Sequence, residues 1–260
     1  MTRRFVLCSE DILSATLARD LCDRVVRERA RAEWLRALWS PELCDTQRAW
    51  TGVYDHAWWC DRGVVDRAAR EGGVRGHVRV AETGRLRAMH GASGTAFKAM
   101  RVAARMAPPP DLVVISGDTE GVTDAERLRA EGVTVAAEAL PALVAEHHRE
   151  SEAWVVAGFV AENEEERGRL AAVTRSLGFD PTGSAHKLLA GDAHDPRDAK
   201  RVCKALLGVD QVTPSAERAR RCWLDTPLEV LEARGEGTGL GRYLRAVEAV
   251  VLPLLGDDAR

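Results

Sequence analysis

A short apolar run that ends at two acidic residues constrains this chain more than any other feature of its sequence. Residues 112–116 are rich in β-branched side chains and predict a strand buried on both faces of a parallel sheet. Asp118 and Glu120 follow at the carboxyl end of that strand, where open α/β sheets bind their ligands. Two carboxylates separated by one residue can hold a hard cation such as Mg²⁺. The pattern therefore predicts a metal site suited to phosphoryl-transfer or nuclease-like chemistry.

The composition predicts a cytoplasmic globular protein. Of 260 residues, 45% are hydrophobic and 30% are charged, and no apolar run approaches the roughly 20 residues that a membrane helix needs. The six cysteines form no Cys-x-x-Cys pair, so we expect reduced thiols rather than a disulfide framework or a zinc site. The net charge of −3 argues against a globally basic nucleic-acid-binding protein, although a local basic face remains open.

Strand and helix patterns alternate along the first part of the chain. Predicted strands lie at residues 4–8, 76–81, 112–116 and 133–137. Predicted helices lie at residues 10–32, 93–106 and 123–131, and Gly132 is expected to end the last of them. This alternation predicts an α/β domain over residues 1–145, with a small, mostly parallel, Rossmann-like sheet flanked by helices.

From residue 146 to residue 260 the pattern is mainly helical. Helix signals occur at residues 164–177, from residue 196 onward, and at residues 228–233 and 239–252. The apolar stretch 152–159 fits either a helix or a strand, because periodicity cannot separate the two at this length. We expect this helical C-terminal part to pack on the α/β domain.

Tryptophan is concentrated in one segment, which we treat as an insertion at about residues 34–75. Five of the seven tryptophans lie between residues 34 and 59. Three interpretations stay open: a core patch, a surface that binds a partner protein, or a platform on which bases stack. Core packing is favoured, and Trp58 and Trp59 are the candidate residues for a partner surface.

A third carboxylate can join the acidic loop. Glu10 follows the first predicted strand, so it would converge with Asp118 and Glu120 if the two strands are neighbours. Three clustered carboxylates repel one another, and a divalent cation is the usual compensation. The alternative is that Asp118 and Glu120 cap the next helix or pair with nearby arginines.

The order strand, Glu10, helix, and later strand, Asp118-Thr119-Glu120-Gly121, resembles the Toprim fold of topoisomerases, primases and overcoming-lysogenization-defect nucleases. In that fold a glutamate after the first strand and an Asp-x-Asp after a later strand surround Mg²⁺. The resemblance implies that Glu10, Asp118 and Glu120 are metal ligands and catalytic residues. It also implies Mg²⁺ or Mn²⁺ as cofactor and a nucleic acid as substrate.

Two further segments are similar to a family of bacterial Toprim-like proteins, some of which are encoded near defence genes. The family segment His-Pro-Glu-x-Glu-Ala-Trp resembles residues 148–154, and an Asp-Pro-x-x-Ala-Lys helix resembles residues 195–200. The likeness covers about residues 4–10 and 110–207. It implies a role in antiviral defence, with a partner protein from the same system.

These segments supply second-rank candidates for the site. Glu150 and Glu152 are candidates for a second metal position or for residues that support the ligands, and the favoured alternative is a solvated helix start. Three cations, Lys200, Arg201 and Lys204, lie on consecutive turns of one predicted helix and are candidate phosphate contacts. A solvated basic face is again the favoured alternative.

Two departures from the family pattern define a competing function. Glu120 stands where the pattern has Asp, and its extra methylene shifts the carboxylate by roughly one C–C bond, whereas Mg²⁺ demands near-octahedral geometry. Arg149 stands where the pattern has Pro. A catalytically degenerate Toprim-like module that binds a partner through its tryptophan-rich segment is therefore the alternative.

Other motifs argue against other enzyme classes. The glycine-rich segment 90–98 is no phosphate loop, because Lys98 follows Phe97 rather than Gly. Ser93 is not in a Gly-x-Ser-x-Gly turn, which argues against a serine hydrolase. The pair His147-His148 lacks the spacing of a zinc site.

Overall fold

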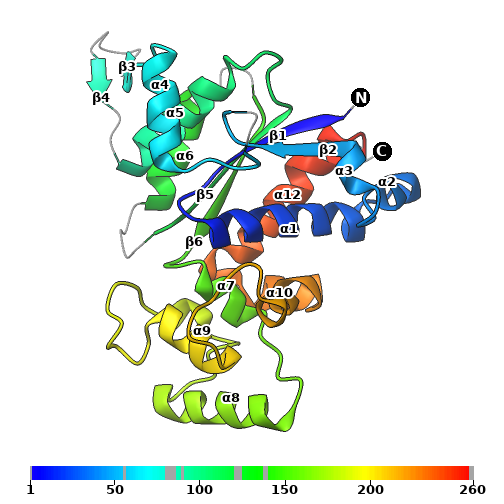
Figure 1. Cartoon of the computed structure of the whole chain (residues 1–260), viewed down its shortest axis with the longest axis vertical. Helices are drawn as coiled ribbons and strands as arrows, with labels where there is room; N and C mark the ends of the chain where they lie inside the picture. Colours follow the sequence, from blue (N-terminus) through cyan, green and yellow to red (C-terminus); the bar gives the residue numbers. More distant parts are fainter. Residues whose placement is uncertain are drawn as a thin grey trace.

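A parallel β-sheet forms the centre of the protein in a computed structural model (Figure 1). The structure describes residues 2–54, 57–79, 86–88, 91–119, 125–136 and 140–257. Among them, four parallel strands pair in the order β2-β1-β5-β6. The strands are β1 (Arg3–Cys8), β2 (Arg48–Thr51), β5 (Leu112–Asp118) and β6 (Ala142–His147). The predicted fold class, α/β with a small, mostly parallel sheet, is confirmed.

Helices cover both faces of this sheet. Side chains of β1 alternate between two apolar clusters, and each cluster also contains residues of helices. Phe5 and Leu7 join the larger cluster, and Val6 and Cys8 join the smaller one. The larger cluster includes α1 (Ile12–Arg29) and α12 (Leu240–Leu254). The smaller one includes α4 (Arg62–Glu71) and α5 (Gly91–Ala103), and α6 (Ala125–Ala136) packs against α5 (Figure 1).

The C-terminal part is helical, as predicted. Its elements are α7 (Glu152–Ala157), α8 (Glu164–Leu177), η1 (Ala185–Lys187), α9 (Ala199–Leu207), α10 (Glu217–Leu224), α11 (Leu228–Arg234) and η2 (Glu236–Thr238), followed by α12. The stretch 152–159, which fitted either a helix or a strand by sequence, contains the helix α7. The helix α12 returns to the sheet and packs beside α1 (Figure 1). One apolar cluster therefore joins residues from both parts of the chain.

Trp154 ties the C-terminal part to the end of the sheet. Its side chain is 1% exposed, and its ring packs edge-on against His147 with a centroid distance of 4.1 Å. Its indole N–H donates to the backbone oxygen of Thr238 at 2.8 Å. A buried indole usually satisfies its N–H in this way. The contact fixes the start of α7 beside the last residue of β6.

The predicted strand at residues 133–137 is wrong, and Gly132 is the reason. Gly132 does not end a helix, because α6 continues through it to Ala136. A Cβ at this position would lie 2.3 Å from the backbone oxygen of Ser93, so the glycine allows α6 to approach α5 closely. The last strand is instead β6, at Ala142–His147. Residue 123, the predicted start of this helix, lies outside the described residues.

The tryptophan-rich segment contains a strand that the sequence pattern did not predict. Its short helices α2 (Glu33–Leu38) and α3 (Cys44–Gln47) precede β2, which pairs with β1 at one edge of the sheet. Trp50 of β2 packs edge-on against Phe5, with ring centroids 5.2 Å apart. The predicted strand at 76–81 begins as β3 (His77–Arg79), but it pairs with β4 (Leu86–Ala88) in a separate antiparallel pair. Residues 80 and 81 lie outside the described residues.

A search of the described helices finds none that is long and apolar enough to cross a membrane.

Replacing Gly132 by Ala is expected to destabilise the fold by roughly 1–3 kcal/mol, because the new methyl group overpacks the α5–α6 contact. Gly168→Ala is the matched control, since Gly168 lies on exposed α8 with open space around it. That change should stabilise the helix by up to about 1 kcal/mol. Urea unfolding of both variants measures the difference, and equal effects would contradict the close approach.

Candidate functional site

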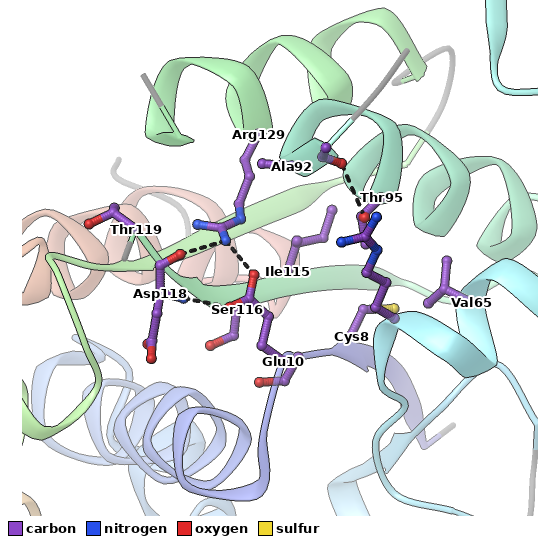
Figure 2. Close-up of a pocket in the computed structure, with 13 residues that line it drawn as sticks. Cys8, Glu10, Val65, Ala92, Thr95, Ile115, Ser116, Asp118, Thr119 and Arg129 are labelled. Carbon is purple, nitrogen blue, oxygen red and sulfur yellow. Dashed lines mark hydrogen bonds and ion pairs between the residues drawn. The ribbon is translucent and has the colours of Figure 1, made fainter. Parts of the chain in front are cut away.

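The candidate site lies where the sheet changes its winding direction. The strand β1 lies between β2 and β5, so the connection from β1 to β2 and the connection from β2 to β5 run in opposite directions along the sheet. Ligands of open α/β sheets bind in the crevice at the carboxyl ends of such strands. A cavity of about 290 Å³ opens here (Figure 2), with apolar walls that include Cys8 and Ile115 and polar groups from Glu10, Asp118 and Arg129.

Glu10 and Asp118 meet at this edge, as the sequence predicted for neighbouring strands. The strands β1 and β5 pair directly, with Cys8 opposite Ile115. The backbone N–H of Asp118 donates to Glu10 Oε2 at 3.2 Å, across 108 residues of sequence. The Glu10 side chain is 42% exposed, so solvent reaches the carboxylate. The next residue, Asp11, caps α1 by accepting from the N–H groups of Leu13 and Ser14.

Arg129 of α6 supplies the positive charge beside Glu10. Its guanidinium donates to Glu10 Oε1 at 2.6 Å and to the carboxylate of Glu146, at the end of β6. It also donates to the backbone oxygens of Gly117 at 3.2 Å and Asp118 at 2.8 Å. The Arg129 side chain is only 6% exposed. One arginine therefore joins the ends of β1, β5 and β6, and Figure 2 shows its contacts with Glu10 and Asp118.

Gly117 makes room for this arginine. A Cβ at position 117 would lie 2.7 Å from Arg129 Nη2 and 2.8 Å from Glu10 Oε1. Both atoms are held by the hydrogen bond between them, so neither can move aside freely. The glycine that interrupts the apolar run before Asp118 is therefore required by the side chains that pack over it.

The Asp118 carboxylate points away from Arg129 (Figure 2). Its side chain is 11% exposed, and Oδ1 lies 3.3 Å from Nδ1 of His147, although the two atoms are not aligned for a hydrogen bond. Within the described part of the chain, this buried Oδ1 and both ring nitrogens of His147 have no hydrogen-bond partner. A buried acceptor without a donor is costly unless a cation or water satisfies it.

Glu150 and Glu152 are buried rather than solvated. Their residues are 4% and 8% exposed. The pKa of Glu152 is raised to about 7, mainly by burial and in smaller part by the charges of Glu150 and Asp118, against the opposing effects of a backbone hydrogen bond and of Lys200. Burial also raises the pKa of Glu150. The favoured sequence interpretation, a solvated helix start, is therefore wrong.

The predicted phosphate contacts lie next to these acids. Lys200 Nζ donates to Glu150 Oε1 at 3.0 Å, and its side chain is 52% exposed. Arg201 is exposed and Lys204 is partly exposed. All three line a hollow of about 470 Å³ together with Glu150. The structure thus brings the basic residues of α9 together with Glu150, which follows β6 in the chain.

Trp58 and Trp59 are partly buried and pack against the larger apolar cluster. Their ring centroids are 6.3 Å apart, and the Arg19 guanidinium lies 4.4 Å from the centroid of Trp58. Trp34 is more exposed, at 54%. The favoured interpretation of this segment, core packing, describes Trp39 and Trp50 well, because they are 2% and 9% exposed.

Two site residues were not among the candidates from sequence. Glu146 was missed because the last strand was placed at 133–137, which hid the pattern of apolar run and terminal acid at 142–146. Burial raises the pKa of Glu146 to about 7, while Arg129 opposes this effect. Arg129 carries no local signal, because an arginine on a polar helix is normally solvated and only the tertiary fold buries it.

The carboxylate oxygens at this edge are of the chemical type that binds a hard cation. Carboxylate oxygens are the ligands that Mg²⁺ and Mn²⁺ prefer, and Asp118 Oδ1, Glu146 Oε2 and Glu150 Oε2 are buried without partners in the described residues. Those residues hold no group of three or more His, Cys, Asp and Glu side chains arranged around one metal position. Glu120, the third predicted ligand, lies outside the described residues.

No protein-family model, curated protein or solved structure matches this chain.

Replacing Arg129 by Met is expected to destabilise the protein by about 3–5 kcal/mol, because it leaves Glu146 buried without its partner. Arg167→Met is the control, since Arg167 pairs with Glu164 on the surface of α8, where loss of an ion pair costs less than about 1 kcal/mol. Urea unfolding at pH 7 compares the two. Similar losses in both variants would show that Arg129 does not hold the strand ends together.

The raised pKa of Glu152 predicts a pH-dependent effect of Glu152→Gln. Protonated Glu152 favours the folded state, so its contribution is complete below pH 4.5 and is lost as the pH rises through about 7. Raising the pKa from 4.5 to about 7 costs the ionised folded protein about 3 kcal/mol. Relative to wild type, Glu152→Gln should therefore gain up to that amount between pH 5 and pH 8.

Urea unfolding in EDTA at both pH values measures this gain. The exposed Glu229→Gln change is the control, and it should shift stability by the same small amount at each pH. A Glu152→Gln effect that is also constant with pH would contradict the buried environment of Glu152.

Proposed function

We propose that this protein is a Mg²⁺- or Mn²⁺-dependent phosphodiester-processing enzyme of the nuclease type. The observation that carries the proposal is the meeting of Glu10 and Asp118 at the carboxyl ends of β1 and β5, beside a cavity at the switch point of the sheet. A parallel sheet that places acids from two distant segments at this edge is suited to hold a cation against a phosphate.

Glu10 and Asp118 would hold the metal, with Glu120 as the third ligand that the Toprim resemblance implies. When bound, the metal would neutralise a phosphodiester oxygen and supply an activated water. Glu10 is solvent-accessible and oriented by two hydrogen bonds, one from Arg129 and one from the backbone of Asp118. Asp118 offers the buried oxygen Oδ1 that no described donor satisfies.

Arg129 and the basic residues of α9 would have different roles at the site. Arg129 neutralises Glu10 and Glu146, which keeps the acids of β1 and β6 close together without full repulsion. Lys200 partly neutralises Glu150, and its exposed side chain leaves its remaining N–H groups free to face solvent. With Arg201 and Lys204 it forms the basic hollow that would contact the phosphates of a nucleic acid.

The same geometry carries a competing function. Arg129 already places a positive charge between Glu10 and Glu146, which is the compensation that a metal would otherwise provide. A catalytically degenerate module would keep this arrangement for stability and bind a partner protein through Trp58 and Trp59. Trp58 lines a hollow of about 740 Å³ beside β2, which offers such a partner a concave surface. The family resemblance would make either form part of a bacterial defence system.

A cleavage assay with single-stranded DNA, duplex DNA and RNA tests the proposal, with Mg²⁺ or Mn²⁺ against EDTA. Wild type should cleave at least one substrate only with metal. Asp118→Asn and Glu10→Gln should lower the rate at least about 100-fold, because each removes a carboxylate that would hold the metal. Glu229→Gln, an exposed change on α11, should leave the rate unaltered.

Calorimetric titration with Mn²⁺ gives a second readout that does not depend on activity. Wild type should bind the ion, and Asp118→Asn should bind it at least about tenfold more weakly. Absence of cleavage and of Mn²⁺ binding in wild type would overturn the proposal that this protein is an enzyme. Capture of a partner that is lost when Trp58 and Trp59 are replaced by Ala would then support the binding module.

A further inference from the structure

Two cysteine thiols touch at the wall of the cavity. The Sγ atoms of Cys8 and Cys60 are 3.3 Å apart, and each residue is 3% exposed. Cys8 is the last residue of β1, and Cys60 lies at the end of the tryptophan-rich segment, two residues before α4 begins. The two sulfurs therefore bring together positions that are 52 residues apart in sequence.

The backbone around the two thiols is already in the geometry of a cross-linked pair. Cys60 forms a one-residue parallel bridge with Cys8. Its N–H donates to the backbone oxygen of Leu7 at 3.0 Å, and its backbone oxygen accepts from Ser9 at 2.9 Å. Paired strands lie about 4.8 Å apart, which is within the Cα separation of 4.4–6.8 Å that disulfides span. Bond formation would close the separation of the sulfurs from 3.3 Å to about 2.05 Å.

A small oxidant has a route to this pair. Cys8 lines the cavity of about 290 Å³, and Figure 2 shows it beside Val65 and below Thr95 on the wall of that cavity. A larger disulfide reagent would be excluded by the burial of both residues, whereas hydrogen peroxide is close to water in size.

We propose that Cys8 and Cys60 are a site of reversible oxidation, at which hydrogen peroxide converts the two thiols to an intramolecular disulfide. One cysteine attacks a peroxide oxygen as its thiolate, the O–O bond breaks, and the hydroxide that leaves takes up the thiol proton to form water. The resulting sulfenic acid is attacked by the second thiol, the S–S bond forms, and a second water leaves. Two thiols are oxidised and one peroxide is reduced to two waters, and a reducing thiol such as dithiothreitol reverses the change.

The disulfide would tie β1 to the start of α4 at the base of the site. Glu10 lies two residues beyond Cys8, and Asp61, which caps α4, follows Cys60 directly. The cross-link closes a loop that contains β2 and the tryptophan-rich segment, and closing a long loop stabilises the folded state. This inference holds whether or not the site processes phosphodiesters.

Peptide mapping tests the pair directly. The full chain is treated with hydrogen peroxide, its remaining thiols are blocked under denaturing conditions, and it is digested with trypsin without reduction. Cys8 falls in the tryptic peptide 5–19 and Cys60 in the peptide 49–62, so the disulfide links these two peptides. We expect two of the six thiols to be lost, and the linked peptide to disappear after dithiothreitol.

Variants separate this pair from the other cysteines. Cys8→Ser and Cys60→Ser should each abolish the linked peptide, and Cys203→Ser, a change at another buried cysteine, should leave it intact. In wild type the oxidised form should unfold at a higher temperature than the reduced form, and this shift should be absent in both single variants. Retention of all six thiols, oxidation to sulfinic acid without a linked peptide, or linkage between other cysteines would overturn the proposal. Because the peptide readout uses wild type, it stands even if a variant folds poorly.

Discussion

The buried guanidinium of Arg129 is the interaction on which this edge of the protein depends. It bonds acids that follow β1 and end β6, and backbone oxygens at the end of β5 between them. Each of these groups would be costly to bury alone, and a planar donor with several N–H groups satisfies them together. The arginine thus fixes the spacing of the strand ends, and Gly117 is the residue that leaves it room. A residue of α6 therefore sets the geometry of the candidate site.

This arrangement divides the acids of the site into two groups of different charge balance. Glu10 and Glu146 share Arg129. The second group contains Asp118, whose carboxylate points away from Arg129 (Figure 2) and lies 3.3 Å from His147. It also contains Glu150 and Glu152, whose pKa values are raised in part by the charge of Asp118. In the second group the described cation is Lys200, which bonds Glu150 from a half-exposed position. Burial without full compensation explains why the pKa values of Glu150 and Glu152 are raised. The side of Asp118 that faces Glu150 is therefore the part of the site with the greatest demand for an added cation.

Sequence was informative where the signal was local. The apolar run at 112–116 and the acid after the first strand correctly predicted that Glu10 and Asp118 share one edge, because parallel neighbours align their carboxyl ends. Gly132 misled because the same residue type ends helices and permits close helix contact, and only packing against Ser93 shows which applies. The strand β2 was hidden because its apolar residues belong to a tryptophan-rich segment without clear alternation. Arg129 could not be found, because its burial depends on the folded chain.

Stability alone does not account for the chemistry of this edge. A core that served only to fold would replace Asp118, His147 and Glu150 by apolar side chains, since partly satisfied buried acids and ion pairs are often no more stable than apolar residues of similar volume. Proteins keep such groups mainly at sites where a ligand completes them. Arg129 pairs with one carboxylate oxygen of Glu146, while Glu146 Oε2 has no partner among the described residues. Asp118 Oδ1 has no hydrogen-bond partner among the described residues, so Asp118 is the acid of this edge on which the proposed function depends most.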